Sequence, residues 1–307
     1  MSNILKIKFD NIVFVATASI LSLIMLNGID NTSSDFSVYL KILQNKTFAN
    51  MKSSEPLSLL IFKFMSLFDN KKLALSIFSI FIYSSVIYLL RNIGFQYIQK
   101  SQYIDIMLII AIGFSFPVLS LSQSILRQGL AIVVILYFLG SAKPLSLFSR
   151  LLLFLLVVLI HNAMAVFLPL VFVKQDINTN KQNLFIFSLL SIIYIYFVKE
   201  LLIEDIKKYA DLSSINFSIS YFIISITSLF MLSLNNFRNS WLPFLYLNSL
   251  IVILVNHNLI NVDRFLYLPW IFAPILMFKF LNNNVLIGLF TILWVGINFI
   301  YQPTRFY

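Results

Sequence analysis

Apolar runs of near membrane-spanning length recur from one end of the sequence to the other, and this feature constrains the fold most. Candidate helical spans cover residues 11–26, 73–90, 103–121, 125–140, 183–198, 217–234, 241–255, 265–281 and 285–301. A helical span needs about 20 apolar residues, within a range of about 17–25. The sequence therefore predicts an all-α, polytopic integral membrane protein with roughly 9–12 transmembrane or re-entrant helices, organised as a single transmembrane domain over residues 1–307.

The composition excludes several classes of function. Of the 307 residues, 60% are hydrophobic and 11% are charged, whereas a soluble domain carries about 25% charged residues. Too few polar side chains remain to cover a globule in water, which excludes a soluble enzyme, a disordered chain and a nucleic-acid-binding domain. The net charge of +10 is assigned to Lys and Arg in short loops, where they set topology and meet anionic headgroups. The absence of cysteine excludes disulfides, thiolate metal sites and cysteine nucleophiles.

The first long polar segment, residues 27–55, is predicted to be an external loop. It leads into the apolar segment 56–68, which is too short for an untilted span and is expected to be re-entrant or interfacial. If segment 56–68 does not cross the membrane, the external loop, Arg127 and the pair Asp263-Arg264 share the external side. If it crosses, Arg127 lies inside, away from the acidic residues of that loop. We favour the first arrangement because it gathers the polar groups.

Other departures from simple spans occur further along the chain. Segment 147–173 is long for one span and short for two, and His161 and Pro169 are candidate positions for a break. Polar clusters such as Arg91-Asn92 are expected to end spans. In segment 199–216 apolar residues punctuate charged ones at roughly helical spacing, which predicts an amphipathic segment on the membrane surface.

Arg127 stands near the start of an apolar helix, within Arg127-Gln128-Gly129-Leu130-Ala131. Its planar guanidinium offers paired donors that suit a phosphate or a carboxylate, and a helix N-terminus also favours an anion. Gln128 is a candidate substrate-binding residue beside it, while Gly129 and Ala131 permit close approach of a backbone or a ligand. The alternative is an interfacial arginine that reaches lipid headgroups.

His161 is the only ionisable residue between Leu151 and Val173. Its ordinary pKa of about 6.5 suits a proton acceptor. The alternative is a neutral histidine hydrogen-bonded to a neighbouring helix. His257 lies in a polar loop and is expected to be solvated. Two separate histidines do not make a metal site, and neither a metal nor a cofactor is expected.

The polar segment 27–55 contains acidic and aromatic residues that are candidates for a site. Asp35 and Tyr39 are four residues apart and share one helical face, and Glu55 directly precedes the short apolar segment. Carboxylates at a membrane surface accept protons or bind sugar hydroxyls, although a solvated loop is the alternative.

Late in the chain, Asp263-Arg264-Phe265-Leu266-Tyr267 opens a span. This sequence is interpreted either as a second anion site or as a local ion pair with an aromatic anchor at the interface.

These motifs, in this order, resemble the EpsG-type branch of the Wzy polysaccharide polymerases of bacteria. The ordered set consists of Asp35-Phe36-x-x-Tyr39, Glu55-Pro56, Leu126-Arg127-Gln128-Gly129-Leu130-Ala131, His161-Asn162-Ala163-Met164 and Arg264-Phe265-x-Tyr267. The resemblance covers most of the chain, and its most specific part is Arg-Gln-Gly-x-Ala. Ala163 stands where members of the family often have serine.

The resemblance implies an enzyme, a membrane glycosyltransferase that polymerises O-antigen, capsule or exopolysaccharide. Such an enzyme works at the outer face of the bacterial cytoplasmic membrane. It transfers the growing glycan from undecaprenyl diphosphate to a sugar hydroxyl of another lipid-linked repeat unit. The implied partners are the undecaprenyl-diphosphate-linked oligosaccharide, the lipid bilayer, a chain-length regulator and a flippase, with neither a sugar nucleotide nor a nucleic acid.

Under this resemblance the polar residues acquire roles. The departing diphosphate needs a cation, and the first and second candidates are Arg127 and Arg264. The acceptor hydroxyl needs a base, and the candidates, in order of pKa suitability, are His161, Asp35 and Glu55. Aromatic rings stack on sugars, and the candidates are Tyr39 and Tyr267.

The main alternative is a flippase or transporter of the same lipid without chemistry. Arg127 and Arg264 would then bind the diphosphate in transit, and His161 would relay protons. An O-antigen ligase usually has a longer external loop, and a membrane acyltransferase is expected to carry its histidine in a more polar helix.

Overall fold

The structure is a computed structural model, and it describes residues 34–46, 48, 55–123, 126–141, 145–173, 181–207, 241–255, 267–281 and 283–301. Over these residues the secondary structure is helical and contains no strand, which confirms the predicted all-α class. The helices are α2 (Ser34–Asn45), α3 (Pro56–Met65), α4 (Lys71–Gly94), α5 (Gln102–Gly113), α6 (Phe116–Gln123), α7 (Leu126–Gly140), α8 (Leu147–Ile160), the 3₁₀ helix η2 (Asn162–Phe172), α9 (Lys181–Lys207), α11 (Leu242–Val255), α12 (Tyr267–Ile271), α13 (Ala273–Leu281) and α14 (Asn284–Tyr301).

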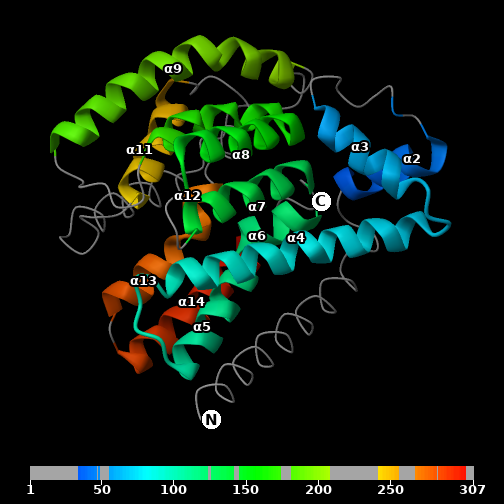
Figure 1. Ribbon diagram of the computed structural model, residues 1–307. Coiled ribbons are helices and arrows are strands. Elements are labelled where there is room, and N and C mark those ends of the chain that lie inside the picture. The colour runs from blue at the N-terminus through cyan, green and yellow to red at the C-terminus, as the bar shows by residue number, and fades with distance from the viewer. Residues whose placement is uncertain are drawn as a thin grey trace.

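Helix α4 runs the length of the molecule and organises the other helices (Figure 1). Helices α2 and α3 lie near its first turn, whereas α5, α13 and α14 gather near its last turn. On another side, α7 packs on α4, α8 packs on α7, and α9 covers η2 and α11. The 24 residues of α4 correspond to about 36 Å, so the two groups of helices lie at opposite ends of the bundle.

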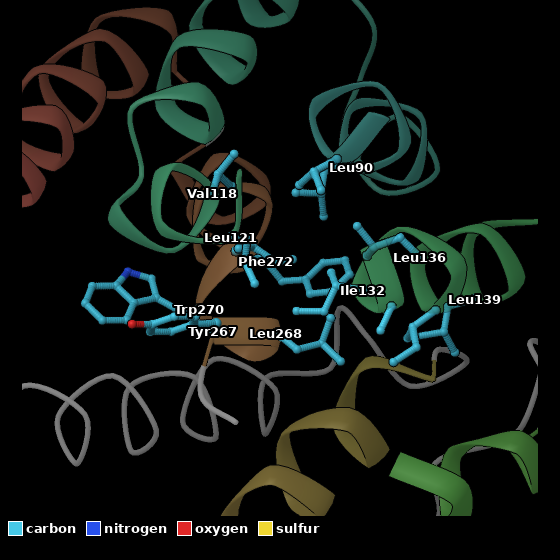
Figure 2. Packing of buried hydrophobic residues seen from close by; sticks show 14 of the residues in the cluster. Leu90, Val118, Leu121, Ile132, Leu136, Leu139, Tyr267, Leu268, Trp270 and Phe272 are labelled. Carbon is cyan, nitrogen blue, oxygen red and sulfur yellow. The ribbon is translucent and has the colours of Figure 1, made fainter. Parts of the chain in front are cut away.

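The centre of the bundle is filled by aliphatic and aromatic side chains from helices that are distant in sequence. Figure 2 shows Leu90 of α4 facing Val118 and Leu121 of α6 and Ile132 of α7, with the rings of the α12 region completing the layer. These side chains are buried. Because this core joins α4, α6 and α7 to the α12 region, it fixes α7 relative to these helices.

The predicted span 103–121 is not one straight helix. It is divided into α5 and α6, and the chain bends by 61° between them. The break is satisfied by distant side chains: the Tyr83 hydroxyl donates to the Gly113 carbonyl at 3.0 Å, and the Phe116 N–H donates to Asn298 Oδ1 at 2.7 Å. A break in a buried helix is tolerated when its freed backbone groups find such partners.

Segment 147–173 is a hairpin with its turn at His161. Helix α8 ends at Ile160, His161 has extended backbone (φ −150°, ψ 103°), and η2 follows at once. At the other end, Arg150 donates to the carbonyl of Val173 at 2.6 Å, so the two arms return to the same place. This confirms the expected break at His161, whereas the expectation of a break at Pro169 is wrong because Pro169 lies inside η2.

One further expectation, about the end of α4, is wrong. Helix α4 does not stop at Arg91-Asn92 but continues to Gly94. The reason is that Arg91 is buried and forms a two-bond ion pair with Asp105 of α5, with both N–O distances at 2.5 Å. Within the predicted external loop 27–55, residues 34–45 form the twelve-residue helix α2, which carries both Asp35 and Tyr39. A polar interval between apolar runs is therefore not always a turn.

Only part of the predicted set of spans meets the length and hydropathy of a membrane-crossing helix. Within the described residues, α4 does so alone and the bent pair α5–α6 does so jointly. The other apolar helices, α3 and the core of α9 among them, have 10–17 residues. The predicted spans 11–26 and 217–234 lie outside the described residues. The helix of segment 199–216 is described only as the end of α9, to Lys207.

Candidate functional site

The carboxylate of Glu55 is the centre of a cluster that four separate segments build. Glu55 immediately precedes α3, Tyr39 lies on α2, Arg127 lies in the first turn of α7, and His161 lies between α8 and η2. Glu55 is 1% exposed. A buried carboxylate needs charged or hydrogen-bonding partners to offset its lost hydration, and these segments supply them.

Each oxygen of Glu55 has a different partner. Oε2 accepts from Nη1 of Arg127 in an ion pair. Oε1 lies 2.8 Å from Nδ1 of His161 and also accepts from the backbone N–H of Asn162 at 3.3 Å. The guanidinium and the imidazole are therefore held by one shared anion.

The Glu55 carboxyl is ionised near neutral pH. Burial by itself raises the pKa of this carboxyl, but the hydrogen bond and charge of His161 and the charge of Arg127 more than compensate, so the pKa lies below its ordinary value. A carboxylate only accepts hydrogen bonds, so Nδ1 of His161 carries the proton that faces it. In the neutral ring the basic nitrogen is then Nε2.

The start of α3 is tied to the end of α8, and this tie sets the distance between Glu55 and His161. Pro56 occupies the first turn of α3, where its missing N–H is not needed. Two residues later, the buried hydroxyl of Ser58 donates to the Ile160 carbonyl at 2.5 Å. That carbonyl is at the C-terminal end of α8, where the helix leaves backbone acceptors unsatisfied.

Arg127 is held on two sides and still reaches the surface. Its Nε donates to the Tyr39 hydroxyl at 3.3 Å, and 22% of its side chain is exposed, compared with 16% for His161. The hydrogen bonds to Tyr39 and Glu55 are donated by Nε and Nη1, and neither involves Nη2. The guanidinium is thus oriented by Tyr39 and Glu55 on a side chain that is partly exposed.

Tyr39 has a positioning role in this structure. It is buried, and its ring packs against Phe62 of α3 with centroids 4.9 Å apart. A buried ring offers no face to a sugar, so the predicted stacking role for Tyr39 is not supported. Tyr267 is also buried, on α12, where it meets Phe116 edge to face at 5.8 Å, and the same argument applies to it.

The structure does not show the other predicted site residues in the interactions that link Glu55, Arg127, His161 and Tyr39. Gln128 is buried in α7 next to Arg127. Asp35 lies in α2, but the placement of its side chain is outside the description, and Asp263 and Arg264 lie outside the described residues altogether. Among the residues that are described, no three His, Asp or Glu side chains are placed to hold a metal ion.

Sequence reasoning missed two contributors, the Asn162 backbone N–H and the Ser58 hydroxyl. Asn162 follows the histidine directly, so a break at His161 was a signal that its N–H would be free. Ser58 carries no comparable signal, because serine is common in the apolar segments of this chain.

Gly129 is required by packing. A Cβ at this position would collide with the backbone carbonyl oxygen of Leu121 and lie 2.9 Å from the Ile82 side chain. The glycine of the Arg-Gln-Gly sequence therefore lets α7 approach α6, and this approach places Arg127.

Gly129→Ala is expected to destabilise the protein by at least about 3 kcal/mol, the upper part of the range for overpacking, because a backbone carbonyl cannot move as a side chain does. Thermal unfolding of the purified protein in detergent checks this. Gly296→Ala is the control, since a Cβ at 296 meets nothing within 4 Å. Equal stability of the two variants would contradict the close approach of α6 and α7.

Comparison of the chain with models of protein families, with curated proteins and with solved structures found no match.

Proposed function

We propose that this chain is a membrane-embedded polymerase of bacterial surface polysaccharide, of the EpsG type within the Wzy polymerases. It transfers a glycan from undecaprenyl diphosphate to a sugar hydroxyl of another lipid-linked repeat unit. The observation that carries the proposal is the carboxylate of Glu55 shared between Arg127 and His161. This arrangement puts a cation for a diphosphate beside an oriented base for a hydroxyl.

The outer surface of the bundle supports a place in the lipid bilayer. Large apolar side chains cover the outward faces of α9 and α14, including Phe185, Phe197 and Ile292, which are 69%, 75% and 70% exposed. Apolar patches of this kind mark a membrane or partner surface in folded proteins. On this proposal α4 crosses the bacterial cytoplasmic membrane, and the shorter helices complete a multi-pass bundle.

The proposed function assigns the orientation of the site. Basic residues lie near both ends of α4, Lys71 and Lys72 at its start and Arg91 near its end, so the rule that basic residues concentrate on the cytoplasmic side does not orient the bundle. On this proposal the Glu55 end faces the exterior, where lipid-linked repeat units are joined.

The reaction consists of one substitution. The acceptor hydroxyl oxygen attacks the anomeric carbon of the donor, the bond from that carbon to the diphosphate oxygen breaks, and the diphosphate leaves with the electron pair. The hydroxyl proton passes to Nε2 of His161, whose ring Glu55 orients as an acid orients the histidine of a catalytic triad. Arg127 stabilises the charge that develops on the leaving diphosphate.

The test is a deletion in the producing bacterium, with the surface glycan and the lipid-linked intermediates analysed. Loss of the polymerase is expected to leave single repeat units on the cell surface, because export continues without elongation. Loss of a flippase would instead leave no repeat units outside. Restoration of long chains by the plasmid-borne gene is the control, and absence of external single units in the deletion strain would reject the polymerase.

A further inference from the structure

Resting on the proposed function, we propose that Glu55 couples occupancy of Arg127 by a diphosphate to proton acceptance at His161. The basis is geometric. One buried carboxylate serves both side chains, Oε2 for the guanidinium and Oε1 for the imidazole. A ligand that changes one of these interactions necessarily changes the other.

The diphosphate competes with Glu55 for Arg127. Its oxygens carry more negative charge than a carboxylate, and guanidinium groups bind phosphate oxygens with paired N–H donors. The Nε bond to Tyr39 and the partial exposure of the side chain allow Arg127 to change its Nη partner without leaving its place. Without a ligand, Glu55 occupies part of this anion site.

Once the diphosphate is seated, Glu55 loses part of its neutralisation by Arg127. Its negative charge then acts more strongly on the imidazole, and a nearby negative charge favours the protonated ring. The charged and titratable groups that meet here, in the part of the chain with described side chains, are Arg127 from α7, Tyr39 from α2, and Glu55 and His161. His161 therefore becomes a better proton acceptor when the leaving group is in position.

This coupling predicts that one substitution strengthens ligand binding and slows chain elongation. Glu55→Gln keeps the shape of the side chain but removes the anion that competes for Arg127. Inorganic pyrophosphate is expected to bind this variant at least fivefold more tightly than it binds the wild type, while chain elongation falls at least a hundredfold. If Glu55 only held Arg127 in place, the variant would bind pyrophosphate more weakly.

Binding is measured by calorimetry on the full chain in lipid nanodiscs. Asp69→Asn is the matched control, because it removes one negative charge from an exposed position beyond α3, and its affinity is expected to stay within twofold of the wild type. A wild type that binds neither pyrophosphate nor a polyprenyl diphosphate would contradict the proposed function. A wild type that binds, with Glu55→Gln equal or weaker, would overturn the coupling alone.

A second measurement keeps the test decisive if Glu55→Gln does not fold. Wild-type pyrophosphate binding is repeated in buffers of different ionisation enthalpy at about pH 7, close to the range in which histidine titrates. Net proton uptake on binding, beyond that measured for pyrophosphate with Arg127→Ala, is expected. The same uptake with and without Arg127, or none with the wild type, would overturn the coupling.

Discussion

Replacing Arg127 with alanine is expected to reduce chain elongation by about 10²–10³-fold, the usual effect of removing one preorganised donor from a developing anion. The variant also leaves Glu55 buried without its cation. Arg127→Lys is expected to elongate chains less than tenfold faster than Arg127→Ala, because an ammonium cannot bind Tyr39, Glu55 and a phosphate in one plane. Polymer length in cells and the extension rate of purified lipid-linked units measure both effects.

Lys63→Ala is the control for Arg127. Lys63 is an exposed cation on α3, in the same region of the fold as Glu55, and its loss is expected to leave the polymer ladder unchanged. A normal ladder from Arg127→Ala, with the protein present at wild-type level, would remove Arg127 from the mechanism.

His161→Ala is expected to lower the rate of elongation by about 10²–10⁴-fold, the range for removal of a general base. Because the base is missing but the cation remains, the variant is expected to bind polyprenyl diphosphate within tenfold of the wild type. Its residual rate is also expected to rise with pH, as hydroxide takes over the proton. Single-turnover rates at several pH values measure this.

The retained binding separates a base from a structural residue. If His161→Ala lost binding and rate together, His161 would act by holding Glu55 and Arg127 in place. If the rate of elongation and the binding both stayed at the wild-type level, His161 would be neither the base nor a structural support for Glu55 and Arg127.

The class of fold was predictable because apolar runs of helical length need no tertiary information. The break at His161 was also accessible, since a lone polar pair inside a long apolar run marks a weak point. The bend between α5 and α6 was not, because its acceptor on Asn298 lies 182 residues from Phe116. No local pattern in residues 103–121 reports such a partner.

The residue types of the site were predictable, but their geometry was not. Arg127 and Glu55 stood out at the edges of apolar segments, His161 inside one, and Tyr39 one helical turn after Asp35. Glu55 is 72 residues from Arg127 and 106 from His161, so only packing brings them together. In the proposed mechanism His161 stays the first candidate base, and Glu55, the last in the order given by the sequence, orients His161 because its two oxygens are bound to Arg127 and His161.

For the membrane protein proposed above, the hairpin formed by α8 and η2 has a consequence for the topology of the chain in the bilayer. Since Arg150 and Val173 meet, the chain leaves this unit on the side where it arrived. In the proposed membrane protein, the hairpin therefore leaves the chain on the same side of the bilayer, however deeply the hairpin inserts. Reporters fused just before residue 147 and just after residue 173 should face the same compartment.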